Sequence, residues 1–73
     1  VIEGNYSVEV GAFRNQNYAR LLQDELMEMD FPARIERGEG FYRVRVGNYR
    51  NLDEAIRMEQ RLKRAGYQTV IVT

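Results

Sequence analysis

The chain carries the same sequence pattern twice. The segment YSVEVGAFRN at residues 6–15 recurs as YRVRVGNYRN at residues 42–51. At the same shift four further pairs correspond: Ala19 with Ala55, Leu26 with Leu62, Phe31 with Tyr67, and Ile35 with Ile71. Self-similarity at a period of a few tens of residues indicates one supersecondary unit used more than once, and two copies must pack together to bury a core. Each half is therefore expected to form the same structural unit.

Composition limits the chemistry that is open to the chain. It has 73 residues, no cysteine and no histidine, and its 11 basic and 11 acidic residues give no net charge. Thiol nucleophiles, imidazole bases and zinc sites built on Cys or His are therefore excluded, and a neutral chain is not expected to bind polyanions generically. We expect no metal, no cofactor and no catalytic residues.

Residues 1–73 are expected to form a single domain with its core in residues 6–73. A chain of this size is near the lower limit for a stable hydrophobic core. No linker interrupts it, and no apolar run approaches the roughly 18 residues needed to cross a bilayer, so we expect no membrane insertion. The abrupt start at Val1 indicates a module excised from a longer protein.

Hydrophobic periodicity predicts four strands. Apolar and polar residues alternate at 6–10, 33–36 and 41–46, as expected for strands with one buried face, and residues 68–73 form the last strand. Gly11 and Gly47 are expected to end the first and third strands. The two glycines within residues 38–40 are expected to supply the positive φ angles of a tight hairpin.

Two helices are predicted, each with an asparagine cap. The first follows Asn15 and is stopped by the segment DFP at residues 30–32. The second follows Asn51, where Glu54 can complete a capping box, and stops at Gly66. The apolar stripes occupy equivalent positions in the two halves: Ala19, Leu22, Leu26 and Met29 in the first, and Ala55, Met58, Leu62 and Ala65 in the second.

This order of elements predicts an α+β protein with the β-α-β-β-α-β ferredoxin-like (RNP-like) fold, a four-stranded antiparallel sheet with two helices on one face. The other face is open. With the third strand between the first and second, its centre carries Ser7, Glu9, Phe41, Arg43 and Arg45, flanked by Arg34 and Glu36. For the last strand the repeat favours Ile71 pointing inward with Val70 and Val72 outward, whereas hydrophobicity alone favours the opposite register.

Phe41 is the leading candidate for a binding residue. Its strand parity places it beside Arg43 and Arg45 on the open face, where an aromatic ring can stack on a sugar or a base; the alternative is that it packs under the hairpin. The two arginines offer forked donors to carboxylates, phosphates or hydroxyl-rich ligands. Alternatively, they pair across strands with Glu9 and Glu36.

Glu9 and Glu36 raise the question of glycoside hydrolysis, which uses two carboxylates. One intervening strand would separate them by about 9–10 Å, at or beyond the upper edge of the range for inverting enzymes, with arginines between them. Catalysis is therefore not expected. Arg14 and Arg50, at the same place in each half, are expected on solvated turns.

These features resemble the SPOR (sporulation-related repeat) domain. The resemblance covers residues 6–73 and rests on Y-x-V-x-V-G-A-F at residues 6–13, the alanine and leucine shared by the two helices, and FYRVRVG at residues 41–47 followed by Tyr49. It implies a noncatalytic, monomeric module of the bacterial cell envelope, in the periplasm or cell wall, with no nucleic-acid partner. Such modules bind peptidoglycan glycan strands that lack stem peptides, which accumulate at division septa and around forespores, and so target a parent protein there.

The resemblance also implies which residues bind glycan: Glu9, Ala12, Phe41, Arg43, Arg45 and, from the last strand, Val70 or Val72. The family commonly has glutamine where this chain has Glu9, and often serine where it has Ala12. A carboxylate at position 9 would repel the lactyl carboxylate of muramic acid unless Arg43 or Arg45 neutralises it.

Two other functions fit the same fold. The RNA-recognition motif has this element order and stacks bases on the same face of its sheet. Its further central-strand aromatics are replaced here by Arg43 and Val44, and the net charge is zero. A small-ligand regulatory or dimerisation domain of ACT-like shape is the other alternative, and it predicts that the purified chain is not a monomer.

Overall fold

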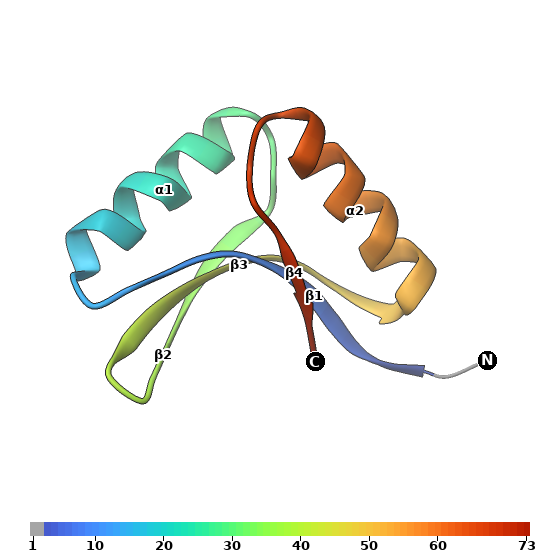
Figure 1. Cartoon of the computed structure of the whole chain (residues 1–73), viewed down its shortest axis with the longest axis horizontal. Coiled ribbons are helices and arrows are strands. Elements are labelled where there is room, and N and C mark those ends of the chain that lie inside the picture. The colour runs from blue at the N-terminus through green and yellow to red at the C-terminus, as the bar shows by residue number, and fades with distance from the viewer. Residues whose placement is uncertain (1–2) are drawn as a thin grey trace.

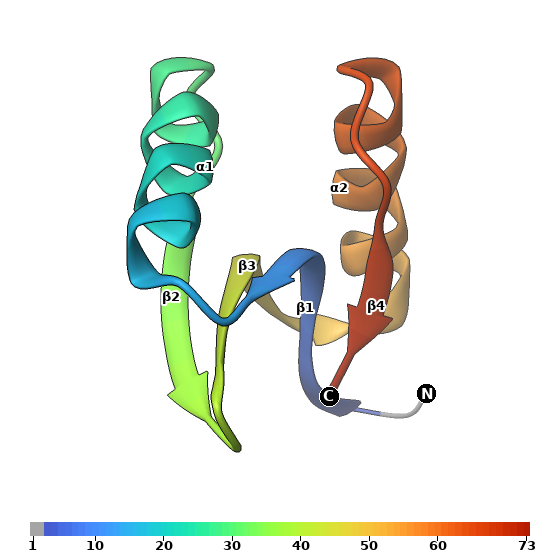
Figure 2. The ribbon, with the colours of Figure 1, turned by 60° about the vertical axis from the view of Figure 1, so that its left-hand side comes forward.

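The computed structural model describes residues 3–73 and contains four strands and two helices (Figure 1). In chain order these are β1 (Glu3–Phe13), α1 (Gln16–Glu28), β2 (Ala33–Gly38), β3 (Phe41–Asn51), α2 (Leu52–Arg64) and β4 (Val70–Val72). All neighbouring strands are antiparallel, in the order β2-β3-β1-β4. Both helices cover the same side of the sheet (Figures 1 and 2). The predicted ferredoxin-like fold is confirmed.

The core lies between the sheet and the helices. The central strands contribute Val8, Val44 and Val46, and the helices contribute Ala19, Leu26, Ala55, Met58 and Leu62. The predicted stripes therefore face the sheet, except at their last members. Met29 and Ala65 are exposed, because they are the C-cap residues of α1 and α2 and lie beyond the last helical turn.

An approximate two-fold axis through the centre of the sheet relates the two halves. Glu9 of β1 pairs directly with Arg45 of β3, the residue that takes its place in the second half, 36 positions later. In an antiparallel pair, a residue that faces its own repeat equivalent lies on a local two-fold axis. The two units therefore meet through equivalent strands, with the axis between Glu9 and Arg45.

Gly11 and Gly47 do not end their strands, contrary to the sequence prediction. β1 continues to Phe13 and β3 continues to Asn51, and the β1–β3 register shifts beside each glycine. Gly47 has a φ of 72°. Such a shift is a β-bulge, which admits an extra residue and bends the strand without ending the ladder. The open face consequently extends further along β1 than the sequence indicated.

An aromatic ring packs over each of these bulge glycines from two positions further along the strand. A Cβ on Gly11 would lie 2.9 Å from the Phe13 ring, and a Cβ on Gly47 would be closer still to the Tyr49 ring. Phe13 and Tyr49 both pack against the core. The glycine and aromatic positions shared by the two repeats therefore form the same packing unit twice.

The β2–β3 hairpin has its positive φ angles at Glu39 and Gly40, with values of 53° and 80°. Gly38 is the last residue of β2 and pairs with Phe41. The tight hairpin is as predicted, but a glutamate, rather than the first glycine, takes one of the two left-handed positions. Two such angles in a two-residue loop match the twist of the flanking strands.

The two helices end in the same way. A residue with positive φ follows each C-cap, Asp30 after α1 (65°) and Gly66 after α2 (98°). The next amide then bonds back to a carbonyl of the last turn, as in a Schellman motif: Phe31 to Leu26 at 3.0 Å and Tyr67 to Leu62 at 3.1 Å. Gly66 is confirmed as the stop of α2, and α1 ends at Glu28 with its C-cap at Met29, directly before the predicted stop segment at residues 30–32.

The helix starts differ from each other. Asn15 caps α1 as predicted, because its side chain accepts a hydrogen bond of 2.8 Å from the Asn17 amide. Asn51 occupies the N-cap position of α2 but forms no side-chain cap bond. Its side-chain amide nitrogen instead donates to the Glu54 carboxylate at 3.1 Å. The predicted capping box is therefore absent from α2.

The last strand, β4, is shorter than the predicted 68–73 and spans Val70–Val72. Ile71 pairs with Val8 and packs against the core, while Val70 pairs with Glu9 and is 60% exposed. The register given by the repeat is therefore confirmed over the one favoured by hydrophobicity alone.

Candidate functional site

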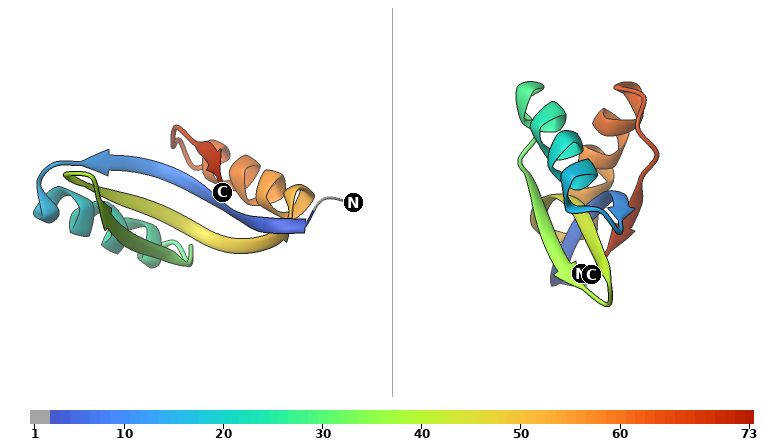
Figure 3. Two further views of the ribbon diagram at one scale, coloured as in Figure 1. Left: turned by 90° about the horizontal axis from the view of Figure 1, so that it is seen from below. Right: turned by 90° about the vertical axis from the view of Figure 1, so that its left-hand side faces the viewer.

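The side of the sheet away from the helices, here called the open face, is covered by neither helix (Figure 3). The strand register brings the residues predicted for ligand binding close together on it. All four strands contribute to it. Its cross-strand pairs are Glu9 with Arg45, Ala12 with Arg43, Glu9 with Val70, Ser7 with Val72, Arg34 with Arg45, Glu36 with Arg43, and Gly38 with Phe41. Ser7 is only 4% exposed, so, contrary to the sequence prediction, it does not belong to the exposed centre of this face.

Arg45 connects two carboxylates at the centre of this face. Its Nε donates to Glu9 Oε1 at 3.2 Å and its Nη1 donates to Glu36 Oε2 at 2.7 Å. The side chains of Arg45 and Glu9 are only 22% and 21% exposed, so this pair is less screened than an ordinary surface ion pair. Glu9 and Glu36 thus face a guanidinium rather than a space for substrate between them.

Arg43 is held at the hairpin end of the same network. Its Nη1 donates to the Gly38 carbonyl at 3.1 Å, and its guanidinium lies 3.7 Å from Glu9 and 3.8 Å from Glu39. The cross-strand pairing that the sequence left open is therefore present for both arginines. Arg34 at the β2 edge donates to the Gly47 carbonyl at 2.6 Å and also lies 3.8 Å from Glu36.

Phe41 is half-buried and lies outside the hydrophobic core cluster. Two guanidiniums approach its ring: the Cζ atoms of Arg14 and Arg43 lie 5.6 and 5.7 Å from the ring centroid. These distances are in the range of cation–π contacts. The ring is thus at the open face between two charged neighbours and does not pack in the hydrophobic core, which was the alternative.

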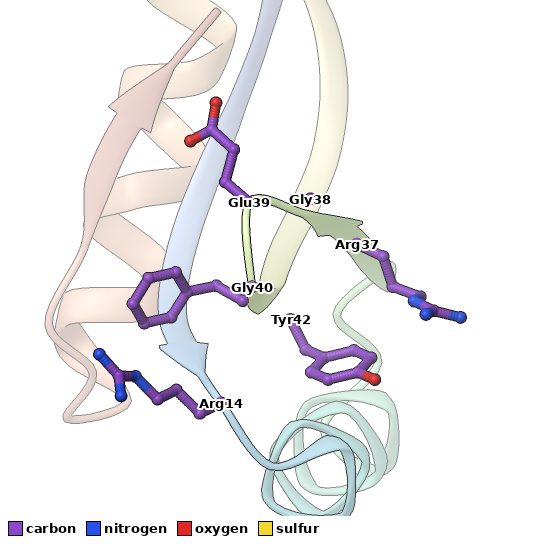
Figure 4. Close-up of a pocket in the computed structure, with 7 residues that line it drawn as sticks. Arg14, Arg37, Gly38, Glu39, Gly40 and Tyr42 are labelled. Carbon is purple, nitrogen blue, oxygen red and sulfur yellow. The ribbon is translucent and has the colours of Figure 1, made fainter.

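A shallow hollow of about 430 Å³ surrounds this end of the sheet (Figure 4). It is lined by Arg14, Arg37, Phe41, Tyr42 and the turn residues 38–40. Tyr42 and Arg37 lie on one side of β3 in Figure 4, and Arg14 lies on the other. The Cζ of Arg37 is 5.5 Å from the Tyr42 ring centroid. The hollow therefore combines aromatic surface with guanidinium groups.

Sequence reasoning missed Arg14, which was expected on a solvated turn. Arg14 directly follows β1, and its guanidinium reaches the Phe41 ring on the open face. The prediction that β1 ends at Gly11 concealed this position. Extending the alternation from Ala12 outward and Phe13 inward would have placed Arg14 outward.

A second hollow of about 240 Å³ lies between β1 and β4. Its lining includes Glu9, the β1 bulge, Gln68 and Val70. Thr69, which also lines it, donates its hydroxyl to the Glu59 carboxylate at 2.9 Å and so ties the segment before β4 to α2. Of the two predicted contacts from the last strand, Val70 is the more exposed.

Neither metal nor membrane-spanning features emerge from the described part of the chain. Within residues 3–73, no three His, Cys, Asp or Glu side chains are grouped so that they could hold a metal ion. Over the same residues, neither helix has the length and apolar character that a bilayer crossing requires.

A comparison with known protein families identifies the family of this chain. The SPOR domain profile matches residues 3–73. The chain belongs to the SPOR domain family. The resemblance to this family that the sequence indicated is therefore confirmed.

Two solved structures are similar to this SPOR domain. The solution structure of the peptidoglycan binding domain of the B. subtilis cell wall lytic enzyme CwlC has a TM-score of 0.86 and 28% identity, covering 94% of this chain and 87% of that one. The crystal structure of the RlpA SPOR domain from Pseudomonas aeruginosa has a TM-score of 0.74 and 30% identity, covering 96% and 99%.

One curated relative is a longer protein. The endolytic peptidoglycan transglycosylase RlpA of Escherichia coli O157:H7 is 33% identical over 72 residues, which are 96% of this chain. The SPOR domain described here spans only 20% of that relative's length.

Proposed function

We propose that this SPOR domain binds peptidoglycan through its open face and recognises glycan strands that lack stem peptides. Its similarity to the peptidoglycan binding domain of CwlC supports the ligand class. The open face supports the location, because it presents polar donors and an aromatic ring along an uncovered sheet. The domain itself is a binding module and not an enzyme.

The observation that carries the proposal is the placement of Phe41. Its ring lies outside the core, at the open face, beside the guanidiniums of Arg14 and Arg43. The apolar face of a sugar ring can stack on such an aromatic ring, while the flanking donors bond to its hydroxyl and acetamido groups. One aromatic ring with hydrogen-bond donors on both sides is the size of site expected for one disaccharide of a glycan strand.

Glu9 is compatible with glycan binding despite being an acid. Arg45 and Arg43 lie 3.2 and 3.7 Å from its Oε1, so its charge is compensated before any ligand arrives. A guanidinium has five donors, and those that Arg43 and Arg45 do not use toward Glu9, Glu36 and Glu39 remain for the glycan. Ala12 lies opposite Arg43 and contributes only a methyl group.

The open shape of the site sets the kind of affinity expected. An uncovered sheet face with shallow hollows does not enclose a ligand, so each disaccharide contributes modestly and successive repeats along the strand add avidity. Val70, at the β1–β4 hollow, and Val72 would extend the contact surface toward that edge.

The biological role that follows is targeting. Residues 1–73 would act as a monomeric module of a longer protein in the bacterial cell envelope, outside the cytoplasm. The module would concentrate that protein where the wall is being remodelled, at the division septum or during sporulation. The relation to RlpA of Escherichia coli, a peptidoglycan transglycosylase, fits a parent protein that acts on the wall.

The test is co-sedimentation of the purified domain with peptidoglycan sacculi, before and after an amidase has removed the stem peptides. The wild-type domain should pellet more strongly with stripped sacculi. Phe41→Ala should weaken that binding about fivefold to tenfold while the domain stays folded. Tyr18→Ala is the matched control, because Tyr18 is an aromatic residue of α1 that is 60% exposed on the helix side.

Absence of pelleting with either preparation would refute the proposal. Equal pelleting with both would leave peptidoglycan binding in place and remove the preference for stripped strands. Binding to single-stranded RNA that collapses steeply with added salt would instead support the RNA-recognition alternative.

A further inference from the structure

We propose that Arg14 binds the lactyl carboxylate of muramic acid by an ion pair. This contact is what allows the domain to distinguish a stripped glycan strand from an intact one. The inference rests on the proposed function and gives it a charge-based mechanism. It also assigns a ligand contact to a residue that lies outside the set predicted from the sequence.

The chemical basis is a charge that exists only after stripping. In intact peptidoglycan the lactyl carboxyl group is an amide with the first residue of the stem peptide and is neutral. An amidase adds water across that C–N bond, releases the peptide with a free amine, and leaves a carboxylate on the sugar. Each stripped muramic acid therefore gains one negative charge, which a nearby cation can recognise.

The other arginines of the open face are already neutralised. Their carboxylate partners match them in number: Arg34, Arg43 and Arg45 face Glu9, Glu36 and Glu39 at distances of 2.7 to 3.8 Å. A ligand carboxylate at any of these arginines would compete with an acidic side chain that is already in place. The central network is therefore suited to neutral hydroxyl and acetamido groups.

Arg14 differs from them in its surroundings. It is exposed, and among the side chains described for residues 4–73 no carboxylate lies within ion-pair distance of it. It directly precedes Asn15, the N-cap of α1, and the first turn of that helix has no acidic residue. Glu39 lines the same hollow but points away from Arg14 (Figure 4). Arg14 thus leaves an uncompensated positive charge at the edge of the hollow.

Its position fits a two-part recognition of one sugar. Arg14 lies over the Phe41 ring at 5.6 Å, beside a hollow of about 430 Å³ that is large enough for a small ligand. An exposed cation–π contact is weak, so a stacking sugar can displace the Arg14 guanidinium from the ring. Arg43 is held by three other partners and stays in place. The displaced Arg14 then pairs with the carboxylate of the stacked sugar, by two parallel hydrogen bonds.

The experiment isolates the carboxylate. Affinities are measured for a stripped oligosaccharide of alternating N-acetylglucosamine and muramic acid, and for the same oligosaccharide with its lactyl carboxylates converted to methylamides. The wild-type domain should bind the carboxylate form about tenfold more tightly. Arg14→Gln should bind both forms equally, with the affinity that the wild type has for the methylamide form.

Two further variants complete the design. Arg20→Gln makes the same charge change at an exposed position of α1, on the other side of the sheet, and should keep the tenfold preference. Arg43→Gln tests the rival assignment at the same platform. Circular dichroism of each variant confirms that it is folded.

Each outcome has a separate meaning. Equal wild-type affinity for the two oligosaccharides overturns the carboxylate inference and leaves glycan binding intact. A preference that survives in Arg14→Gln and disappears in Arg43→Gln assigns the carboxylate to Arg43 and overturns the role of Arg14. Failure of the wild type to bind either form overturns the proposed function itself.

Discussion

The two halves of this SPOR domain share a backbone but carry opposite charges where they meet. Glu9 and Arg45 are repeat equivalents and pair across the two-fold axis at 3.2 Å. Two identical repeats would place two glutamates or two arginines opposite each other at this point, and like charges opposite each other destabilise a sheet. The halves attract each other at the axis because their sequences differ there.

The same contrast recurs where each helix end meets the other half. Glu25 and Arg61 are equivalent positions on α1 and α2, as are Phe31 and Tyr67 after them. The Tyr67 hydroxyl donates to the Glu25 carboxylate, and the Arg61 guanidinium lies 5.3 Å from the Phe31 ring centroid. The Tyr67 hydroxyl can donate a hydrogen bond to a carboxylate, and the Phe31 ring can form a cation–π contact with a guanidinium. Each aromatic residue therefore interacts favourably with the charged residue of the other half.

The helices also differ in how their ends are stabilised. α1 has a side-chain cap at Asn15 and no charged residues that favour its dipole in the first or last turn. α2 has no side-chain cap bond, but acids in its first turn and Arg61, Lys63 and Arg64 in its last. Charges of this arrangement complement the helix dipole. One backbone unit is therefore stabilised in two chemically different ways.

The largest expected difference between the halves is at the bulge glycines. Gly47→Ala should lower the free energy of unfolding by about 2–4 kcal/mol, because it combines a positive φ with displacement of the Tyr49 ring. Gly11→Ala should cost about 1–2 kcal/mol, since only the packing against Phe13 and Leu22 is disturbed. Denaturant titrations of the two variants measure both values. Equal losses would show that the backbone angle at Gly47 contributes nothing.

The charges at the axis should give the next largest effect. Arg45→Glu should destabilise the domain by about 2 kcal/mol, because Glu9 and Glu36 would then face a third carboxylate. The double exchange Glu9→Arg with Arg45→Glu should recover only part of this loss, since an arginine at position 9 would face Arg43 and a glutamate at position 45 would face Glu36. Thermal unfolding of the wild type and the variants tests this. Full recovery would contradict a network and indicate an isolated pair.

The helix caps should show a smaller contrast. Asn15→Ala should cost about 1 kcal/mol, because the Asn17 amide loses its acceptor. Asn51→Ala should cost only about 0.2–0.5 kcal/mol, since its side chain contacts the exposed Glu54 and not the helix backbone. The comparison is made by denaturant unfolding under one buffer condition. A larger loss at Asn51 would mean that it caps α2 in solution.

The sequence was sufficient for the fold because the repeat and the periodicity act together. The repeat placed Ile71 inward against the hydrophobicity of Val70 and Val72, and the structure agrees. Strand parity also placed Phe41, Arg43 and Arg45 on one face. These features depend on the order of apolar and polar residues, which is visible in a single chain.

The remaining features depend on local geometry that one sequence does not define. A glycine after an alternating segment fits both a strand end and a bulge, so the length of β1 and the position of Arg14 were missed. The alternation along a strand predicts on which face of the sheet Arg43 lies, but not the conformation of its side chain. Its contact with Glu9 therefore could not be predicted from the sequence. The functional roles of the site residues remain predictions, because neither parity nor the fold tests them.

The smallest contrast concerns Tyr67, whose phenol has no counterpart at Phe31. Burial, together with the hydrogen bond to Glu25, raises the pKa of Tyr67 from its ordinary 10.0 to about 12. A folded-state pKa above the unfolded one means that the protonated phenol stabilises the fold. This stabilisation is complete below about pH 10 and is lost as the pH rises from about 10 to about 12.

Tyr67→Phe removes this titration and makes the second half resemble the first. At neutral pH the variant should be less stable by about 0.5 kcal/mol, the contribution of one accessible hydrogen bond. The difference from the wild type should shrink between about pH 10 and 12, because only the wild type loses the phenol's contribution there. Denaturant unfolding of both proteins at several pH values measures this difference, in which the contributions of the other tyrosines cancel. A difference that stays constant across this range would show that the folded environment, Glu25 included, does not raise the pKa of Tyr67.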